Sequence, residues 1–323
     1  MNVELPMCLL DWISETKINL NSLSLNSSEG AIQLLKNYPH RINWRFLSKN
    51  SSEGAIRLLK QNQHRINWFM LSQNLSKRAI LLLEKNPNQI YWDILSANPS
   101  EGAIQLLKTN KKKIILPWLS RNTSEGAMRL LEKNPDKIDW NQLSRNPSAI
   151  KLLEKNQNKI NWKYLSGNPS AIHLLEKNPD KIHWWYLSEN TSEGAIKLLE
   201  KNLDKIDWEY LSANPSAMRL LEKNPDKIEW DDLSSNPSES AIRLLEKNQD
   251  KINWRLLSGN PSAIHLLEKY PNKINWYNLS QNPRIFNYDY KQMKNNCMLF
   301  KEDLMKNRFH PHNISKFKNW GFF

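Results

Sequence analysis

Residues 168–190 read NPSAIHLLEKNPDKIHWWYLSEN, and close copies of this stretch fill most of the chain. The tryptophan of this stretch recurs throughout, and Leu20 and Leu116 take its place in two copies, so the sequence contains twelve units. The tryptophans are Trp44, Trp68, Trp92, Trp140, Trp162, Trp184, Trp208, Trp230, Trp254 and Trp276. Self-similarity at a period of about 20–50 residues is typical of repeat proteins, whose units pack only on their neighbours.

The units differ in length by one dipeptide, which reads NPSEGAI in the longer units and NPSAI in the shorter ones. Two residues inserted inside a helix would rotate everything after them by about 200°. The apolar pattern is unchanged on both sides, so the insertion is predicted to lie in a turn. Five glycines fall at this place and are interpreted as turn residues. They are Gly30, Gly54, Gly102, Gly126 and Gly194.

Each unit predicts two helical pieces. The first has one apolar face, formed by Ala171, Ile172, Leu174 and Leu175 in the quoted unit. Asparagine and proline at 168–169 are expected to start it, and asparagine before proline at 178–179 to end it. In the longer units, the spacing of Asn190 and Glu193 is typical of a capping box.

The second piece is predicted to be shorter, six or seven residues from the tryptophan, and either α-helical or 3₁₀. Asn or Asp often precedes the tryptophan, as expected for a helix cap. The alternation of a strand is absent. The predicted fold is therefore all-α: an α-solenoid of about twelve 22- or 24-residue two-helix repeats, on the order of 100 Å long as a rod or arc.

The two ends depart from the repeat. Residues 1–20 are interpreted as a degenerate N-terminal capping repeat, 21–282 as the helical array and 283–323 as a C-terminal helical cap. Within that cap, Met293, Cys297, Phe300 and Leu304 predict one amphipathic helix over about 288–308. A last short helix carrying Trp320 is expected after the break at 310–312.

Composition and charge narrow the functional class. The chain of 323 residues has a net charge of +13, and residues 121–281 contribute only +1 of it. The basic character therefore belongs to the two ends. Two cysteines, Cys8 and Cys297, make a disulfide framework improbable. No apolar run reaches the length of a membrane span, and no secretory signal is recognised, so a cytoplasmic location without a membrane partner is expected.

The unit NPSAIxLLEKNPDKIxWxxLSxN and the closing segment YKQMKNNCMLFKEDLMKNRFHPHNISKFKNWGFF resemble tryptophan- and leucine-rich repeat proteins of giant DNA viruses of amoebae and algae, such as the Mimivirus-like group. The resemblance covers essentially the whole chain. It implies a viral protein of the host cytoplasm or the virion and assigns no active residues. The two-helix unit also resembles the leucine-rich-variant solenoids in fold.

The tryptophans are predicted to belong to the core, because leucine replaces them in two units. Positions that vary between units are better candidates for partner binding. Among them, Tyr164, Trp185, Tyr186 and Tyr210 could form an aromatic stripe on one wall. The alternative is that these tyrosines cover the seam between units. Substituting Tyr164, Trp185 or Tyr186 by alanine is expected to weaken partner capture with little change in stability.

No metal, cofactor or catalytic site is predicted. His40 and His64 occupy equivalent positions in neighbouring units, on the order of 10 Å apart, without an accompanying carboxylate or thiol. No nucleophile turn or glycine-rich phosphate loop is recognised. The chain is therefore expected not to be an enzyme and to have no small-molecule substrate.

Two functions remain open. The first is a scaffold for protein–protein interaction, which suits a long, nearly neutral array with varied surface positions. The second is binding of RNA or DNA by the basic N-terminal units. Its candidate contacts are Arg41, Arg45, Arg65, Lys111, Lys112 and Lys113.

Overall fold

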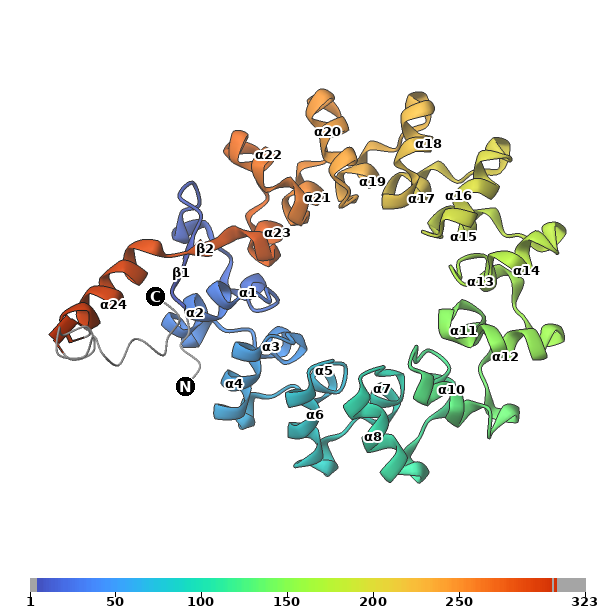
Figure 1. Cartoon of the computed structure of the whole chain (residues 1–323), viewed down its shortest axis with the longest axis horizontal. Coiled ribbons are helices and arrows are strands. Elements are labelled where there is room, and N and C mark those ends of the chain that lie inside the picture. The colour runs from blue at the N-terminus through green and yellow to red at the C-terminus, as the bar shows by residue number, and fades with distance from the viewer. Residues whose placement is uncertain (1–4, 304, 307–323) are drawn as a thin grey trace, which may run out of the picture.

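The computed structural model describes residues 5–303 and 305–306 and shows a ring of helical units (Figure 1). Each full unit consists of an outer α-helix, a short 3₁₀ helix and an inner α-helix. The outer helices form the circumference and the inner helices line the central opening (Figure 1). The predicted all-α solenoid is confirmed, but the rod or arc is wrong, because the solenoid bends until its two ends meet.

The inner helices start at the tryptophan position. They are α1 (Leu20–Leu23), α3 (Trp44–Lys49), α5 (Trp68–Ser72), α7 (Trp92–Ala97), α9 (Leu116–Leu119), α11 (Trp140–Arg145), α13 (Trp162–Ser166), α15 (Trp184–Glu189), α17 (Trp208–Ala213), α19 (Trp230–Ser235), α21 (Trp254–Gly259) and α23 (Trp276–Gln281). The second helix of the unit, left open between α and 3₁₀, is thus α-helical.

The outer helices contain the LLEK segments. They are α2 (Glu29–Asn37), α4 (Glu53–Gln61), α6 (Lys77–Glu84), α8 (Glu101–Thr109), α10 (Glu125–Leu131), α12 (Ile150–Lys155), α14 (Ile172–Glu176), α16 (Glu193–Glu200), α18 (Met218–Lys223), α20 (Glu239–Lys247) and α22 (Ile264–Lys269). The shorter units lack the dipeptide. In three of them, and after Asn282, short 3₁₀ helices lie where the longer units have the first turn of the outer helix. They are η7 (Pro147–Ala149), η11 (Pro215–Ala217), η14 (Pro261–Ala263) and η16 (Pro283–Ile285).

A third helical piece, which the two-helix prediction did not include, joins each outer helix to the following inner helix. We call this row of 3₁₀ helices the turn edge. It comprises η1 (Glu15–Lys17), η2 (Pro39–Arg41), η3 (Gln63–Arg65), η4 (Pro87–Gln89), η5 (Lys111–Lys113), η6 (Pro135–Lys137), η8 (Gln157–Lys159), η9 (Pro179–Lys181), η10 (Leu203–Lys205), η12 (Pro225–Lys227), η13 (Gln249–Lys251) and η15 (Pro271–Lys273).

Side-chain caps explain where most helices begin. The residue before the tryptophan position caps the inner helix as predicted; for example, Asn253 Oδ1 accepts a hydrogen bond from the Leu256 N–H at 3.2 Å. In the longer units the outer helix is capped by serine, not by the predicted asparagine. Ser192 Oγ accepts from the Ala195 N–H at 3.3 Å, and Glu193 is the first helical residue.

The core is one continuous annulus between the outer and inner helices. In each full unit the alanine near the start of the outer helix, the second leucine of that helix and the leucine of the inner helix are buried, as with Ala171, Leu175 and Leu187. The ten tryptophans are half-buried and pack against this core. Each unit therefore buries its apolar residues on its neighbours, so stability is distributed along the array.

Buried asparagines connect every unit to the one before it. We call them the asparagine ladder. Its members are Asn26, Asn50, Asn74, Asn98, Asn122, Asn146, Asn168, Asn190, Asn214, Asn236, Asn260 and Asn282, none more than 4% exposed. Asn98, for example, donates through Nδ2 to the carbonyls of Ser72 at 3.1 Å and Asn74 at 2.9 Å. These bonds satisfy backbone oxygens that would otherwise be buried without partners.

The same contacts continue across the junction between the first and last units. Asn26 Nδ2 donates to the carbonyls of Ser280 at 3.1 Å and Asn282 at 2.8 Å, the same two bonds that Asn98 makes to its preceding unit. The Asn19 N–H donates to Ser280 Oγ at 2.9 Å, which repeats the bond from the Asn43 N–H to Ser24 Oγ. Helix α1 packs on α23. The ring therefore closes with the ordinary contact between units.

The closing unit is composite, because both ends of the chain build it. Residues 15–23 supply its 3₁₀ and inner helices, and residues after Asn282 supply the outer part. Ile285 is fully buried, and Phe286 packs under Gly30 as Ile32 does under Gly54. The sequence Pro283–Phe286 thus continues the repeat for half a unit, although these residues were assigned to the C-terminal helical cap.

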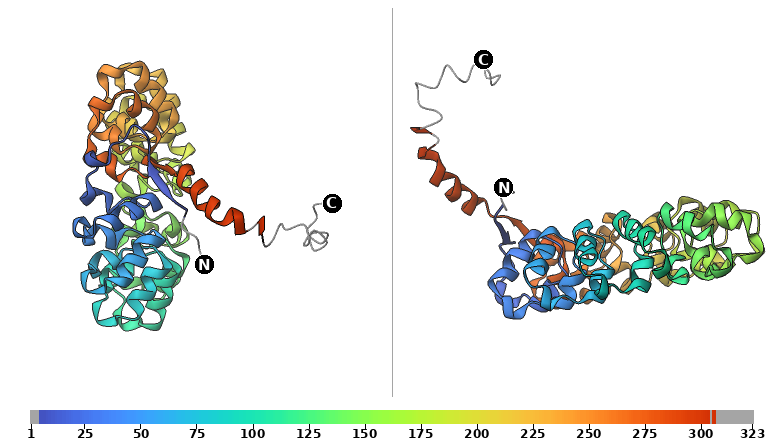
Figure 2. Two further views of the ribbon diagram at one scale, coloured as in Figure 1. Left: turned by 90° about the vertical axis from the view of Figure 1, so that its left-hand side faces the viewer. Right: turned by 90° about the horizontal axis from the view of Figure 1, so that it is seen from below.

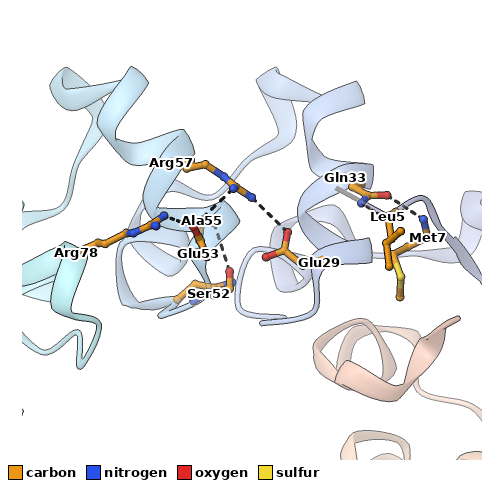
Figure 3. A network of polar contacts seen from close by, with 10 residues as sticks. Leu5, Met7, Glu29, Gln33, Ser52, Glu53, Ala55, Arg57 and Arg78 are labelled. Carbon is orange, nitrogen blue, oxygen red and sulfur yellow. Dashed lines mark hydrogen bonds and ion pairs between the residues drawn. The ribbon is translucent and has the colours of Figure 1, made fainter. Parts of the chain in front are cut away.

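A small antiparallel sheet fastens this junction. Strand β1 (Met7–Leu9) pairs with β2 (Phe286–Tyr288), with Cys8 opposite Asn287. The side chain of Gln33 in α2 holds the start of β1 (Figure 3). Its Oε1 accepts from the Met7 N–H at 3.0 Å, and its Nε2 donates to the Leu5 carbonyl at 2.8 Å. Neither strand was predicted.

The C-terminal helix does not cover the end of the stack as expected. Helix α24 (Tyr290–Asp303) leaves the ring beside β2 and projects away from it (Figure 2). Tyr290 and Met298 are 67% and 57% exposed. The end that a cap would cover is already occupied by the N-terminal unit. The predicted helix with Trp320 lies outside the described residues.

The glycines of the longer units lie in the first turn of the outer helix, and none of the described ones has the backbone conformation that requires glycine. Their role is close packing. A Cβ on Gly194 would lie 2.7 Å from Ile172 Cγ2 of the preceding unit, and one on Gly126 would lie 2.6 Å from Ile104 Cγ2. The interpretation of these glycines as turn residues is therefore wrong.

No helix in residues 5–303 and 305–306 is both long and apolar enough to cross a membrane.

Candidate functional site

The inner wall of the ring is the surface where units differ most. On each inner helix the tryptophan, leucine and serine pack toward the core, so the residues directly after the tryptophan and before the ladder asparagine face the opening. These two positions lie four residues apart and share one helical face. No two units carry the same pair of residues at these positions; α3, for example, has Arg45 and Lys49, whereas α15 has Trp185 and Glu189.

The four predicted aromatic residues do come together on this wall. The Tyr186 ring lies 5.5 Å from that of Tyr164 and 4.2 Å from that of Trp185. Trp185 in turn contacts Tyr210 edge-to-face, with centroids 4.5 Å apart. Three neighbouring inner helices, α13, α15 and α17, thus share one aromatic cluster. Edge-to-face pairs of this kind fix the rings in place.

Burial divides the cluster. Tyr186 is 8% exposed and lies in the seam between units, where the alternative interpretation placed it. Tyr164, Trp185 and Tyr210 are half-buried and keep part of each ring accessible. Cations approach the buried tyrosine: Lys163 Nζ lies 5.6 Å and Arg145 Cζ 5.9 Å from its centroid. Partner binding stays a prediction, and it now rests on the three accessible side chains, Tyr164, Trp185 and Tyr210.

Carboxylates surround the exposed side of this cluster. We call the combined surface the acidic–aromatic arc; it comprises Trp185, Tyr186, Glu189, Glu209, Tyr210, Asp231 and Asp232. Arg145 donates to both oxygens of Glu189, at 2.9 and 3.1 Å, across the intervening Gly167. No ion pair is recorded for Glu209, Asp231 or Asp232 within the described part of the chain. The acidic character of this surface was not predicted, because the charge of the central units sums to nearly zero.

Burial and neighbouring carboxylates together raise two pKa values in the arc. The pKa of Asp232 is raised, first by partial burial and then by repulsion from Glu209, Asp231 and Glu229. The pKa of Tyr210 is also raised, first by desolvation and then by several carboxylates, of which Glu209 is the largest contributor. A cation bound beside these groups would lower both pKa values, because it favours their negatively charged forms.

The predicted nucleic-acid contacts separate into two surfaces. Arg41, Arg65 and the run Lys111–Lys113 lie on the turn edge and are exposed. Arg45 lies instead on α3, where it faces the opening. Across the ring from the acidic–aromatic arc, α3 thus contributes Arg45 and Lys49 (Figure 1).

A basic position recurs along the turn edge, three residues before the tryptophan position. It holds Lys17, Arg41, Arg65, Gln89, Lys113, Lys137, Lys159, Lys181, Lys205, Lys227, Lys251 and Lys273. In several units this cation lies over the tryptophan of the preceding unit, as with Lys251 Nζ at 4.6 Å from the Trp230 centroid. The closing unit does the same, with Lys17 Nζ 5.0 Å from the Trp276 centroid. In these units a cation–π contact between neighbouring units accounts for the cation at this position.

On the outer wall, several charged side chains form ion pairs with each other, which makes this wall a weaker candidate for partner binding. The Arg57 guanidinium lies 3.8 Å from Glu29 and from Glu53, and Arg78 also pairs with Glu53 (Figure 3). Such exposed pairs contribute little individually. His173 contacts Glu154 at 2.8 Å. No group of three or more potential metal ligands occurs among the described residues.

No family model, no curated protein and no solved structure matches this chain.

Proposed function

We propose that the ring is a non-catalytic scaffold that holds a basic segment of a partner protein against its inner wall, at the acidic–aromatic arc. The resemblance to repeat proteins of giant DNA viruses implies that this partner is bound in the host cytoplasm or in the virion. The main support is the cluster of contacting aromatic side chains, which Glu209, Asp231 and Asp232 border. Within the described residues these three carboxylates form no ion pair.

The chemistry of the arc favours lysine and arginine side chains. Accessible faces of Trp185 and Tyr210 attract cations, and more strongly where water is displaced. The neighbouring carboxylates supply charge-assisted hydrogen bonds to the same groups. A curved wall of aromatic anchors in a charged rim is an arrangement typical of protein interfaces.

A binding experiment with lysine- and arginine-rich peptides tests this proposal. Binding is measured by calorimetry for the native chain and for Trp185→Ala and the double variant Glu209→Gln/Asp231→Asn. We expect each to weaken binding about tenfold or more. The matched control is Asp204→Asn/Glu222→Gln, which removes two exposed carboxylates away from the inner wall. Equal affinity of all variants would refute the arc as the binding surface.

Tyr186 must be treated apart in that experiment. Because it is nearly buried, Tyr186→Ala is expected to lower stability by about 3 kcal/mol, as truncation of a buried aromatic side chain does. The expectation of unchanged stability is retained for Trp185 and Tyr164. Thermal unfolding of the three alanine variants separates seam packing from partner binding.

A second candidate function, binding of RNA or DNA, is supported by the turn edge of the N-terminal units. There His40, His64 and Lys112 precede the recurring cation, whereas several later units have aspartate in that place, as in Asp180 and Asp250. Gel shifts in a salt series test it, since phosphate contacts are strongest at low salt. Absence of a shift at about 50 mM salt would remove this function.

A further inference from the structure

The turn edge has a hollow of about 760 Å³ at the junction where the ring closes. Three consecutive units line it: the last unit with Trp276 and Tyr277, the closing unit with residues 17–21, and the next with residues 40–44. Its volume falls within the range of small-molecule sites. It lies at the turn edge and is distinct from the acidic–aromatic arc.

The hollow coincides with a missing indole. The closing unit has Leu20 where most units have tryptophan, and the indoles of Trp276 and Trp44 in the units on either side line the hollow. In the following unit, the Arg65 guanidinium lies 5.6 Å from the Trp44 centroid. The equivalent Arg41 would cover the indole that Leu20 does not supply. A planar aromatic group of a ligand would therefore fit the space that the indole fills in most other units.

The polar lining favours an anion. Lys17, His40 and Arg41 line the hollow, and none of its lining residues is acidic. The nearby carboxylate of Glu15 accepts a hydrogen bond from the Tyr38 hydroxyl, which raises the pKa of that tyrosine. Asn19, Asn21 and Asn43, which have side-chain amides, also line the hollow. Two or more positive groups with amide donors suit a phosphate or carboxylate.

The amides still have donors to offer. Asn43 Nδ2 donates to Asn21 Oδ1, and Asn19 Oδ1 accepts from the Ser22 N–H. Within the described part of the chain no hydrogen bond is recorded from the Nδ2 groups of Asn19 and Asn21. Such amides can bind the polar edge of a heterocycle or an anionic oxygen.

We propose that this hollow binds a small aromatic anion of the nucleoside monophosphate class, whose base takes the place of the missing indole beneath Arg41 and whose phosphate pairs with Lys17 and Arg41. The occupant joins the first, second and last units. Its binding therefore stabilises the closed ring as well as filling the hollow.

Calorimetric titration of the full chain with AMP tests the proposal, with adenosine and inorganic phosphate as the two partial probes. We expect AMP to bind at one site and each partial probe to bind at least about tenfold more weakly. AMP should also raise the unfolding temperature. No AMP binding at about 1 mM, or phosphate binding as tight as AMP, would overturn the proposal.

Two pairs of variants locate the site. Leu20→Trp restores the indole of the repeat, so it should abolish AMP binding while the ring stays folded; Leu116→Trp, the same change at the other leucine position, should leave binding intact. Arg41→Ala should weaken AMP binding about tenfold or more, whereas Lys159→Ala, the equivalent cation of the α13 unit on the opposite side of the ring, should not. Circular dichroism confirms folding. If Leu20→Trp does not fold, Arg41→Ala decides, and AMP affinity unchanged in Arg41→Ala contradicts the assignment.

Discussion

The asparagine at the end of each inner helix does two things at once. Asn98 donates to two carbonyls of the preceding unit and accepts from the Ser100 N–H of its own at 3.0 Å. The sequence shows this residue in every unit, yet its pattern is equally compatible with a simple helix stop. Only the stacking of two units reveals that its amide group faces buried carbonyls. This role could therefore not be predicted from one unit alone.

Substitution of a ladder asparagine should be costly. Asn98→Ala leaves two buried carbonyls without donors, and we expect a loss of about 2–4 kcal/mol in the free energy of unfolding. Asn88→Ala, an exposed asparagine on the turn edge, is the control and should change it by less than about 0.5 kcal/mol. Urea denaturation measures both. Similar losses for the two variants would show that the ladder bonds are not important for stability.

The close packing of isoleucine side chains against the glycines of the longer units predicts that alanine at these glycines lowers stability. Gly194→Ala places a methyl group against Ile172 Cγ2 and should destabilise the chain by about 1–3 kcal/mol. Gly259→Ala is the control, because its Cβ would meet only Asn278 Cβ, at 3.8 Å. That variant should be neutral or stabilising by up to about 1 kcal/mol. Thermal unfolding should therefore show a lower unfolding temperature for Gly194→Ala and an equal or higher one for Gly259→Ala. An unchanged unfolding temperature of Gly194→Ala would contradict the packing role.

At the scale of elements, the helices were predictable because their signals are local. The apolar spacing of the LLEK segments gives the outer helix, and Asn or Asp before the tryptophan gives the start of the inner one. The 3₁₀ helices of the turn edge were missed because three residues leave no periodicity to detect. Strands β1 and β2 were missed because they pair only through the closure of the ring.

The caps of the inner helices can be tested one at a time. Asn253→Ala removes the acceptor for the Leu256 N–H, so we expect a loss of about 1 kcal/mol. Asp250→Ala, in the preceding 3₁₀ helix of the same unit, removes an exposed side chain and should have little effect. Chemical denaturation of both variants provides the comparison. A larger loss for Asp250→Ala than for Asn253→Ala would be inconsistent with capping.

At the scale of the whole molecule, closure was not predicted, since curvature depends on small rotations between units that the repeat pattern does not encode. A signal was nevertheless present. The N-terminal unit lacks an outer helix, and Pro283–Ile285 forms the short 3₁₀ helix that precedes an outer helix in shorter units, here followed by β2. Two half units at opposite ends can complete each other. The acidic–aromatic arc was found only in part, because its carboxylates come from different units.

Closure predicts that a residue at the junction matters as much as one in the middle of the array. Asn26→Ala should reduce the free energy of unfolding by the same 2–4 kcal/mol, approximately, as Asn98→Ala, because Asn26 makes the equivalent bonds to the last unit. In an open solenoid Asn26 would lie at a free end. A loss much smaller than that of Asn98→Ala, measured in the same denaturation experiment, would therefore indicate an open chain.

The most direct test measures the distance between the first and last units. Spin labels are placed at Asn21 and Tyr277, which are exposed and occupy equivalent inner positions, in a chain with Cys8→Ser and Cys297→Ser. Labels at Arg255 and Tyr277, in adjacent units, give the reference. A closed ring predicts the same strong dipolar broadening for both pairs, at about 10 Å between units. Broadening in the reference pair alone would show that the ends do not meet and would contradict the ring.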